Sequence, residues 1–328
     1  MREYASRKTL RLHTPGHKGR LNELDITELT DGAFPAQAIA EAEESIAKIY
    51  GAKHAHLLCG GSSQGVKASV YFANGDGIAD LNSHRSVLDG FKLAGKNCKL
   101  VGNKGMRPIT VSDIANAIDG TVKTVVVTSP TYYGFCADLD GIRALCDRYG
   151  LTLIVDGAHG AHFGFGEQLP KRFAHIPDIC NVSAHKTLYA LTQSAIAFDN
   201  LGDEESNRYK ATLDLFGTTS PSYLLLSSIE DGVTRAAENG ASRYAELYGA
   251  VQDLKKKYPF VDNDDFTRLV LDCKDMGGGA EVNATLARLG VMSEMYDGRY
   301  IVFIVTAEDS ADDIILFDKA LYSVIHRF

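Results

Sequence analysis

The chain has 328 residues, of which 34 are basic and 42 are acidic, for a net charge of −8. At about 100 to 200 residues per domain, this length predicts one large domain, or a large and a small one, with a sizeable core. The acidic balance argues against nucleic acid or an anionic membrane as the main partner, and 45% hydrophobic residues is an ordinary globular composition.

Neither a membrane span nor a secretory signal is expected. The sequence has no run of about 18 apolar residues, and its first residues lack the apolar stretch of a signal peptide. The six cysteines are scattered without a CxxC pair, so we expect reduced thiols rather than disulfides or zinc ligands. These features predict a cytoplasmic protein.

The first half of the chain alternates between helix and strand patterns. A helix is predicted from Pro35 to a glycine stop at Gly51, and the apolar run HAHLLCG follows as a strand. The alternation continues through GIADL (strand), 86–93 (helix), CKLVG (strand), VSDIANAI (helix), TVVVTSP (strand), LDGIRALCDRYG (helix) and TLIVDGAHG (strand). This order predicts an α/β fold with a parallel sheet, in which ligands bind beyond the carboxyl ends of the strands.

The second half predicts an outgoing helix and a small lobe. ICNVS and SAIAF are two more strands, and residues 221–257 form one long helix or a broken pair. After Pro259 come strand RLVLDC, a glycine turn at 277–279, helix EVNATLARLG, strand YIVFIVT and a helix over 309–326. The predicted organisation is an N-terminal segment (1–34) near the active site, a large domain (35–257) and a small α+β domain (258–328).

A glycine-rich turn follows the first predicted strand. In Gly60-Gly61-Ser62-Ser63-Gln64-Gly65 a strand passes into a helix. Glycines allow close approach of a ligand, and the free N–H groups and dipole of a helix N-terminus attract an anion. The turn therefore predicts a phosphate site, although tight packing alone is an equally good explanation of such a turn.

Three other strand ends carry polar side chains. Asp156 closes TLIVD and is either a functional acid or the cap of the next turn. Lys186, after ICNVS, is a candidate amine nucleophile that forms a Schiff base, because an apolar setting lowers the pKa of lysine. His84 follows GIADL and is structural or catalytic. An anion cradle, an acid and a buried lysine are together what pyridoxal 5'-phosphate (PLP) requires.

Seven strings of the chain resemble one enzyme family. They are LHTPGHKG, DITEL, GGSSQG, SPTYYGFCADL, VDGAHGAHFGF, SAHKTLYALTQSA and TTSPSYLLLSSIE. In this order, from about Leu12 to about Asp231, they resemble the major domain of the Orn/Lys/Arg decarboxylases, which are PLP enzymes with the aspartate aminotransferase fold. The resemblance implies a mainly parallel seven-stranded sheet, decarboxylation of a basic amino acid such as lysine, ornithine or arginine, and a homodimer.

The resemblance also implies a role for each matched residue. Lys186 would hold the cofactor aldehyde, Asp156 would pair with the pyridine nitrogen, and His84 and Ala158 would pack on the two faces of the ring. The implied phosphate ligands are Gly61, Ser62, Ser63, Ser183 and His185, with Thr219 and Ser220 reaching the phosphate of the neighbouring subunit. Lys186, His84 and His159 are candidate proton donors to the product carbon.

Two departures from the family pattern stand out. Gly157 replaces the glutamate of the family string D-E-A-H-G, which puts local rigidity and activity in question. The chain also stops after one small lobe, so assemblies that need the family's further domains are not expected. The carboxylate that would bind a basic side chain is not identified by the sequence, and Asp25, Glu28 and Asp31 are candidates.

Two alternatives stay open at this point. An aminotransferase or another Cα lyase of this fold would grip the substrate carboxylate with an arginine, for which Arg299 before YIVFIVT is a candidate; a solvated turn is the simpler explanation. A protein that keeps the fold and cofactor but only binds or regulates is the second alternative, which Gly157 and the short C-terminus leave open.

Overall fold

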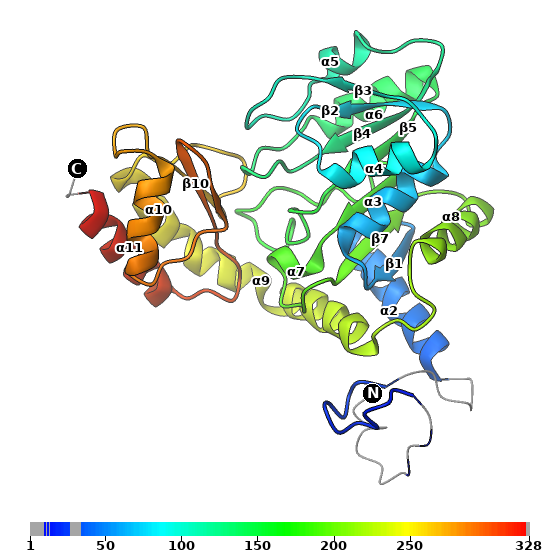
Figure 1. Cartoon of the computed structure of the whole chain (residues 1–328), viewed down its shortest axis with the longest axis horizontal. Helices are drawn as coiled ribbons and strands as arrows, with labels where there is room; N and C mark the ends of the chain where they lie inside the picture. The colour runs from blue at the N-terminus through cyan, green and yellow to red at the C-terminus, as the bar shows by residue number, and fades with distance from the viewer. Residues whose placement is uncertain (1–9, 11, 13, 27–33, 326–328) are drawn as a thin grey trace. The chain divides into compact units, whose positions relative to one another are not determined.

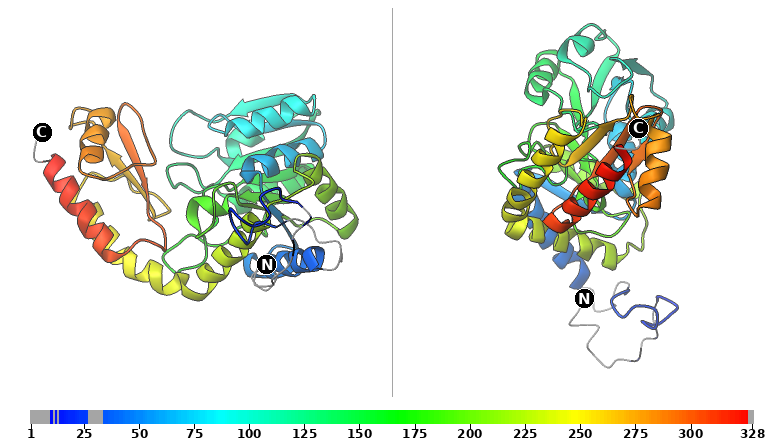
Figure 2. Two further views of the ribbon diagram at one scale, coloured as in Figure 1. Left: turned by 60° about the horizontal axis from the view of Figure 1, so that its bottom comes forward. Right: turned by 90° about the vertical axis from the view of Figure 1, so that its left-hand side faces the viewer.

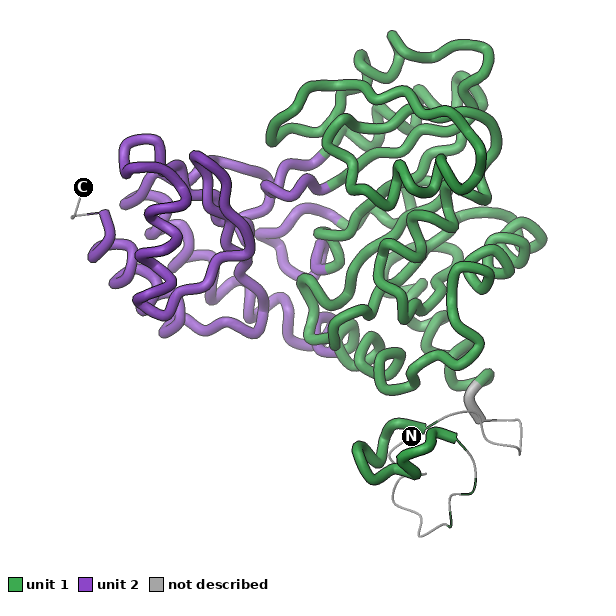
Figure 3. The backbone as a smooth tube through the Cα atoms, in the orientation of Figure 1, with its two compact units in different colours: residues 1–129, 137–161, 172–234 green, residues 130–136, 162–171, 235–328 purple. Residues whose placement is uncertain are grey.

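The structure is a computed structural model that describes residues 10, 12, 14–26 and 34–325. The chain forms two compact units, shown in Figure 3. Unit 1 comprises residues 1–129, 137–161 and 172–234, and unit 2 comprises residues 130–136, 162–171 and 235–328.

Unit 1 is built on a seven-stranded sheet with the order β1-β7-β6-β5-β4-β2-β3 (Figure 1). The strands are β1 (His54–Leu58), β2 (Asp76–Asp80), β3 (Cys98–Val101), β4 (Val122–Thr128), β5 (Thr152–Asp156), β6 (Ile179–Val182) and β7 (Ala195–Asp199). Strand β7 runs antiparallel to both β1 and β6, and the other neighbours pair in parallel. The predicted mainly parallel sheet is therefore confirmed. The central strands are almost fully buried, as expected for a sheet covered by helices.

Helices precede, connect and follow these strands, and several of them pack against the sheet. They are α2 (Phe34–Tyr50), α3 (Gly61–Phe72), α4 (Arg85–Leu93), α5 (Val111–Ala115), α6 (Leu139–Tyr149), α7 (Ala184–Thr187) and α8 (Asp203–Leu215). Helices α3 and α4 lie side by side (Figure 1). Local sequence sets the ends of α6: Asp138 caps its first turn by accepting from Gly141 N at 2.9 Å, and Gly150 ends it in the left-handed conformation.

Unit 2 holds a three-stranded antiparallel sheet with the order β8-β10-β9. Its elements are β8 (Arg268–Asp272), α10 (Gly279–Arg288), β9 (Met295–Tyr296), β10 (Tyr300–Ile304) and α11 (Ala311–Ile325). Helix α10 contacts β9, β10 and α11 (Figure 2). Among the described residues, no helix has both the length and the apolar character needed to cross a membrane.

Helix α9 (Tyr223–Lys257) is one continuous helix, which decides between the two predicted forms of this segment. The sequence placed a domain boundary after residue 257, whereas the two units divide inside α9, between residues 234 and 235. The later part of α9 packs with unit 2, since Tyr244 stacks edge-on against Phe266 and Arg243 Nη2 donates to Asp309 O at 2.9 Å.

Candidate active site

The predicted cradle is the turn from β1 into α3. Gly61 has a φ of +71°, which favours glycine, and its N–H donates to Gln193 O at 2.8 Å. No atom lies within 4 Å of the position that a Cβ of Gly61 would take, so the space above the turn is open. The N–H of Gly61 is taken by Gln193, and the N–H groups that follow it in the first turn of α3 have no partner within the helix and face the end where an anion would bind.

Hydroxyl groups from two strand ends meet at this turn. Ser183 follows β6, and its Oγ donates to Ser62 Oγ at 2.8 Å. Both serines are buried. His185 lies two residues further on, where its Nδ1 donates to Ser194 O at 2.8 Å, because a carbonyl oxygen only accepts. The structure thus joins Ser62 and Ser183 directly. The bond to Ser194 uses Nδ1 of His185, so it does not involve Nε2 of that ring.

Asp156 ends β5 in the interior of unit 1, with 3% of its surface exposed. Its Oδ1 accepts from Ala158 N at 3.2 Å. Burial raises the pKa of the Asp156 carboxyl, and the Ala158 N–H, Lys186 and His84 act in the opposite direction. A buried carboxylate with few polar partners is suited to holding a positively charged group.

Lys186 lies in α7, beside a histidine in the turn that follows β5. Its Nζ is 3.1 Å from Nε2 of His159, which is 6% exposed. A charged lysine only donates, so His159 accepts through Nε2 whenever Lys186 is protonated. The two groups can therefore pass a proton between them, which fits their prediction as candidate proton donors.

His84 is fixed as the N-cap of α4. Its Nδ1 accepts from Ser86 N at 3.2 Å, so in the neutral ring the proton is on Nε2. Asp80 holds the preceding turn, because its carboxylate accepts from Asn82 N at 2.7 Å and from Ile109 N at 3.2 Å. The end of β2 therefore presents a histidine of defined orientation.

The structure brings together residues that follow β1, β2, β5 and β6, all in unit 1. Thr219 and Ser220 do not join them: both are exposed between α8 and α9, and among described contacts Ser220 N donates to Thr218 Oγ1 at 3.2 Å. Of the candidate substrate carboxylates, Asp25 pairs with His17 at 3.0 Å. Glu28 and Asp31 lie outside the described residues.

Two residues that support the cradle, Gln193 and Ser194, were not predicted from the sequence. Gln193 takes a left-handed φ of +78° and presents the carbonyl that binds Gly61 N. Ser194 provides the carbonyl that orients His185. A non-glycine residue in this conformation is held by its surroundings, and such strain gathers at functional sites. The string ALTQSA in the resemblance was the signal that could have identified both.

Phe173 explains why position 157 is glycine. A Cβ on Gly157 would lie 2.7 Å from Cζ and 2.8 Å from Cε2 of Phe173, and 3.3 Å from Cγ1 of Val182. Gly157 N also donates to Asn181 O at 2.8 Å. The ring of Phe173 thus fills the space beside the Asp156 turn, and the turn is packed without a side chain at 157.

We expect Gly157→Glu to destabilise the protein by about 1–3 kcal/mol, because the new side chain overlaps Phe173. Urea unfolding of the purified variant measures this loss. The double variant Gly157→Glu, Phe173→Ala is expected to recover part of the loss, since the two positions share one space. Unchanged stability in Gly157→Glu would show that the ring moves freely and does not pack the turn.

Arg299 is engaged on the surface of unit 2. Its Nε donates to Asp272 Oδ1 at 2.8 Å and its Nη2 to Asp272 Oδ2 at 2.5 Å, and half of its side chain is exposed. This pair holds the turn before β10 and is what a solvated turn arginine is expected to do. The observation that suggested an aminotransferase is accounted for by this ion pair.

No group of three or more His, Cys, Asp or Glu side chains in the described part of the chain is arranged to hold a metal ion. All six cysteines are free, and Cys146, Cys180 and Cys273 are buried. The chemical features of this site are the amine of Lys186, the carboxyl of Asp156 and the turn at Gly61.

The fold and the strand-end residues define the class of PLP enzymes with the aspartate aminotransferase fold. A family model described as Orn/Lys/Arg decarboxylase, major domain, matches residues 102–272, just over half of the chain. The chain belongs to this family.

The chain is also similar to known enzymes in sequence or in fold. The chain is 25% identical to an arginine decarboxylase of Bacillus cereus over 99% of its own length and 81% of that protein. It superposes on the lysine decarboxylase LdcF of Francisella novicida with a TM-score of 0.78 and 18% identity, covering 98% of this chain and 58% of that chain. A serine palmitoyltransferase with PLP gives a TM-score of 0.69 and 17% identity, with 87% and 76% covered.

Proposed function

We propose that the protein is a PLP-dependent amino acid decarboxylase whose substrate is basic, such as lysine, ornithine or arginine. The observation that carries the proposal is the buried Asp156 close to Lys186, with the cradle at Gly61 in the same unit. The family supports decarboxylation as the reaction, and the arginine and lysine decarboxylases among the relatives support a basic substrate.

The residues fit the three polar groups of PLP. Open space above Gly61, the N-terminus of α3 and the Ser62–Ser183 pair suit a phosphate. Lys186 supplies the amine for the aldehyde. Asp156, whose pKa burial raises, would gain from a pyridinium N–H the charged partner that a buried carboxylate needs.

When bound, PLP supplies an electron sink for the bonds of the substrate Cα. Asp156 would keep the ring nitrogen protonated, and His84 and Ala158 would hold the ring. Loss of CO₂ leaves an electron pair on Cα that must receive one proton. Lys186 Nζ and His159 Nε2, 3.1 Å apart, form a pair that can deliver that proton and recover it from solvent.

A reduction experiment tests this function. We expect the purified protein with PLP to show a visible absorption band that borohydride abolishes, leaving a mass tag on the peptide that contains Lys186. The same preparation should release CO₂ and the corresponding amine from lysine, ornithine or arginine, detected by mass. A tag on another lysine contradicts the site, whereas bound PLP without turnover of any amino acid supports the non-catalytic alternative.

A further inference from the structure

A cavity away from the strand-end residues lies in unit 1, between α2, β1, α8 and the start of α9. Its volume is about 120 Å³, enough for a ligand of a few heavy atoms. Part of the wall is apolar and includes Ile39, Leu58, Leu213 and Leu226. Its polar lining includes His56 and Glu43, which take no part in the proposed decarboxylation.

His56 is fixed from one side only. Its Nε2 lies 2.8 Å from Oδ2 of Asp199, a fully buried carboxylate that also accepts from Ser206 Oγ at 2.9 Å. Because the carboxylate accepts, Nε2 carries the proton and the neutral ring offers a lone pair at Nδ1. His56 is 7% exposed, and Nδ1 is buried with no hydrogen-bond partner among the described residues.

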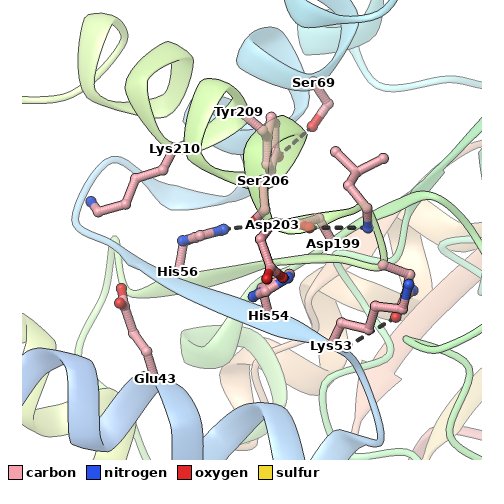
Figure 4. Close-up of polar contacts among 12 residues, drawn as sticks. Glu43, Lys53, His54, His56, Ser69, Asp199, Asp203, Ser206, Tyr209 and Lys210 are labelled. Atoms are coloured by element: carbon pink, nitrogen blue, oxygen red, sulfur yellow. Dashed lines mark hydrogen bonds and ion pairs between the residues drawn. The ribbon is translucent and has the colours of Figure 1, made fainter.

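Figure 4 shows the His56 ring between Asp199 on one side and the side chains of Glu43 and Lys210 on the other. Glu43 accepts from Leu57 N at 3.0 Å through Oε1. Burial raises the pKa of the Glu43 carboxyl, and the hydrogen bond from Leu57 N–H acts in the opposite direction. The carboxylate is thus poorly solvated and lies near an imidazole nitrogen that lacks a partner.

The remaining charges at the cavity largely cancel. Lys210 and Asp214 form an ion pair one turn apart on α8, with Nζ and Oδ1 separated by 3.5 Å. Glu43 forms no ion pair with any other described residue, and Nδ1 of the neutral His56 ring is a second acceptor. Two acceptors of this kind require N–H donors with positive charge, and the apolar walls suit an alkyl chain.

We propose that this cavity binds a primary alkylammonium compound, with the ammonium donating to Glu43 and to Nδ1 of His56. An ammonium group has three N–H donors, so it satisfies both acceptors at once. The site does not depend on the proposed reaction. Decarboxylation of an amino acid yields a primary amine, however, so the class includes the product of that reaction if the proposed function is correct.

Calorimetric titration with butylammonium tests the proposal. The holoenzyme is first reduced with borohydride, which removes the carbonyl-derived bond with which an amine could react. We expect butylammonium to bind, and butanoate, an anion of similar length, not to bind. Glu43→Gln, which keeps an acceptor for Leu57 N–H, is expected to weaken butylammonium binding by about tenfold or more.

Glu44→Gln is the matched control. Glu44 is the next residue on α2, where its exposed carboxylate pairs with Lys48 at 2.6 Å, so this variant is expected to bind like the parent. Equal binding by Glu43→Gln and the parent overturns the proposal, as does tighter binding of butanoate or no binding of butylammonium at all. Because the readout is heat of binding, a protein without decarboxylase activity still gives a decisive result.

Discussion

Asp156→Asn is expected to lower kcat by about 10²- to 10⁴-fold while the protein still takes up PLP. A neutral amide does not stabilise a protonated ring nitrogen, so the electron sink is lost. The loss falls on kcat because the negative charge on Cα develops only toward the transition state. Steady-state kinetics with the best substrate, together with the visible spectrum of bound PLP, measures both parts of this prediction.

Stability distinguishes a chemical effect from a structural one. Burial raises the pKa of Asp156 in the folded protein, so ionising this group opposes folding as pH rises through that pKa. The asparagine amide does not ionise, so it carries no such cost to folding, and its oxygen can still accept from Ala158 N. The cofactor-free variant should therefore be at least as stable as the parent at neutral pH. A near-normal kcat would show that Asp156 only caps the turn.

The strand-end residues were predictable because their chemistry and their position in an α/β fold are both local properties of the sequence. Asp156 and Lys186 each follow a strong apolar run, and parallel strands bring such ends to one edge of a sheet. The contact of Lys186 with His159 was not predictable in detail, since it depends on the rotamers of two side chains 27 residues apart.

Features that depend on tertiary packing escaped the sequence analysis. Helix α8 was not predicted because its sequence is mostly polar. Only the fold shows that Tyr209 and Leu213 are buried on one face of this helix. From the sequence, Gly157 was interpreted as the loss of a side chain that the family carries. In the fold, the ring of Phe173, 16 residues away, occupies the space that this side chain would take. His56 and Asp199 are separated by 143 residues and meet through the β1–β7 pairing.

Mixing two inactive variants is expected to restore activity if each site is completed by the partner subunit through Thr219 and Ser220. Lys186→Ala removes the amine, and Thr219→Glu places a negative charge where a phosphate is expected. The exposure of Thr219 and Ser220 suits a contact with another chain, and Leu215 nearby is 77% exposed. In a hybrid dimer one site then carries both changes and the other carries neither.

Random exchange makes about half of the dimers hybrid, each with one intact site, so about one quarter of the parent activity should return. Neither variant regains activity when mixed with itself, which is the control for refolding during exchange. An independent label, such as different affinity tags recovered in one dimer, establishes that exchange has occurred. Exchange without activity would place Thr219 in the site of its own subunit, because a hybrid then has one lesion in each site and no intact one.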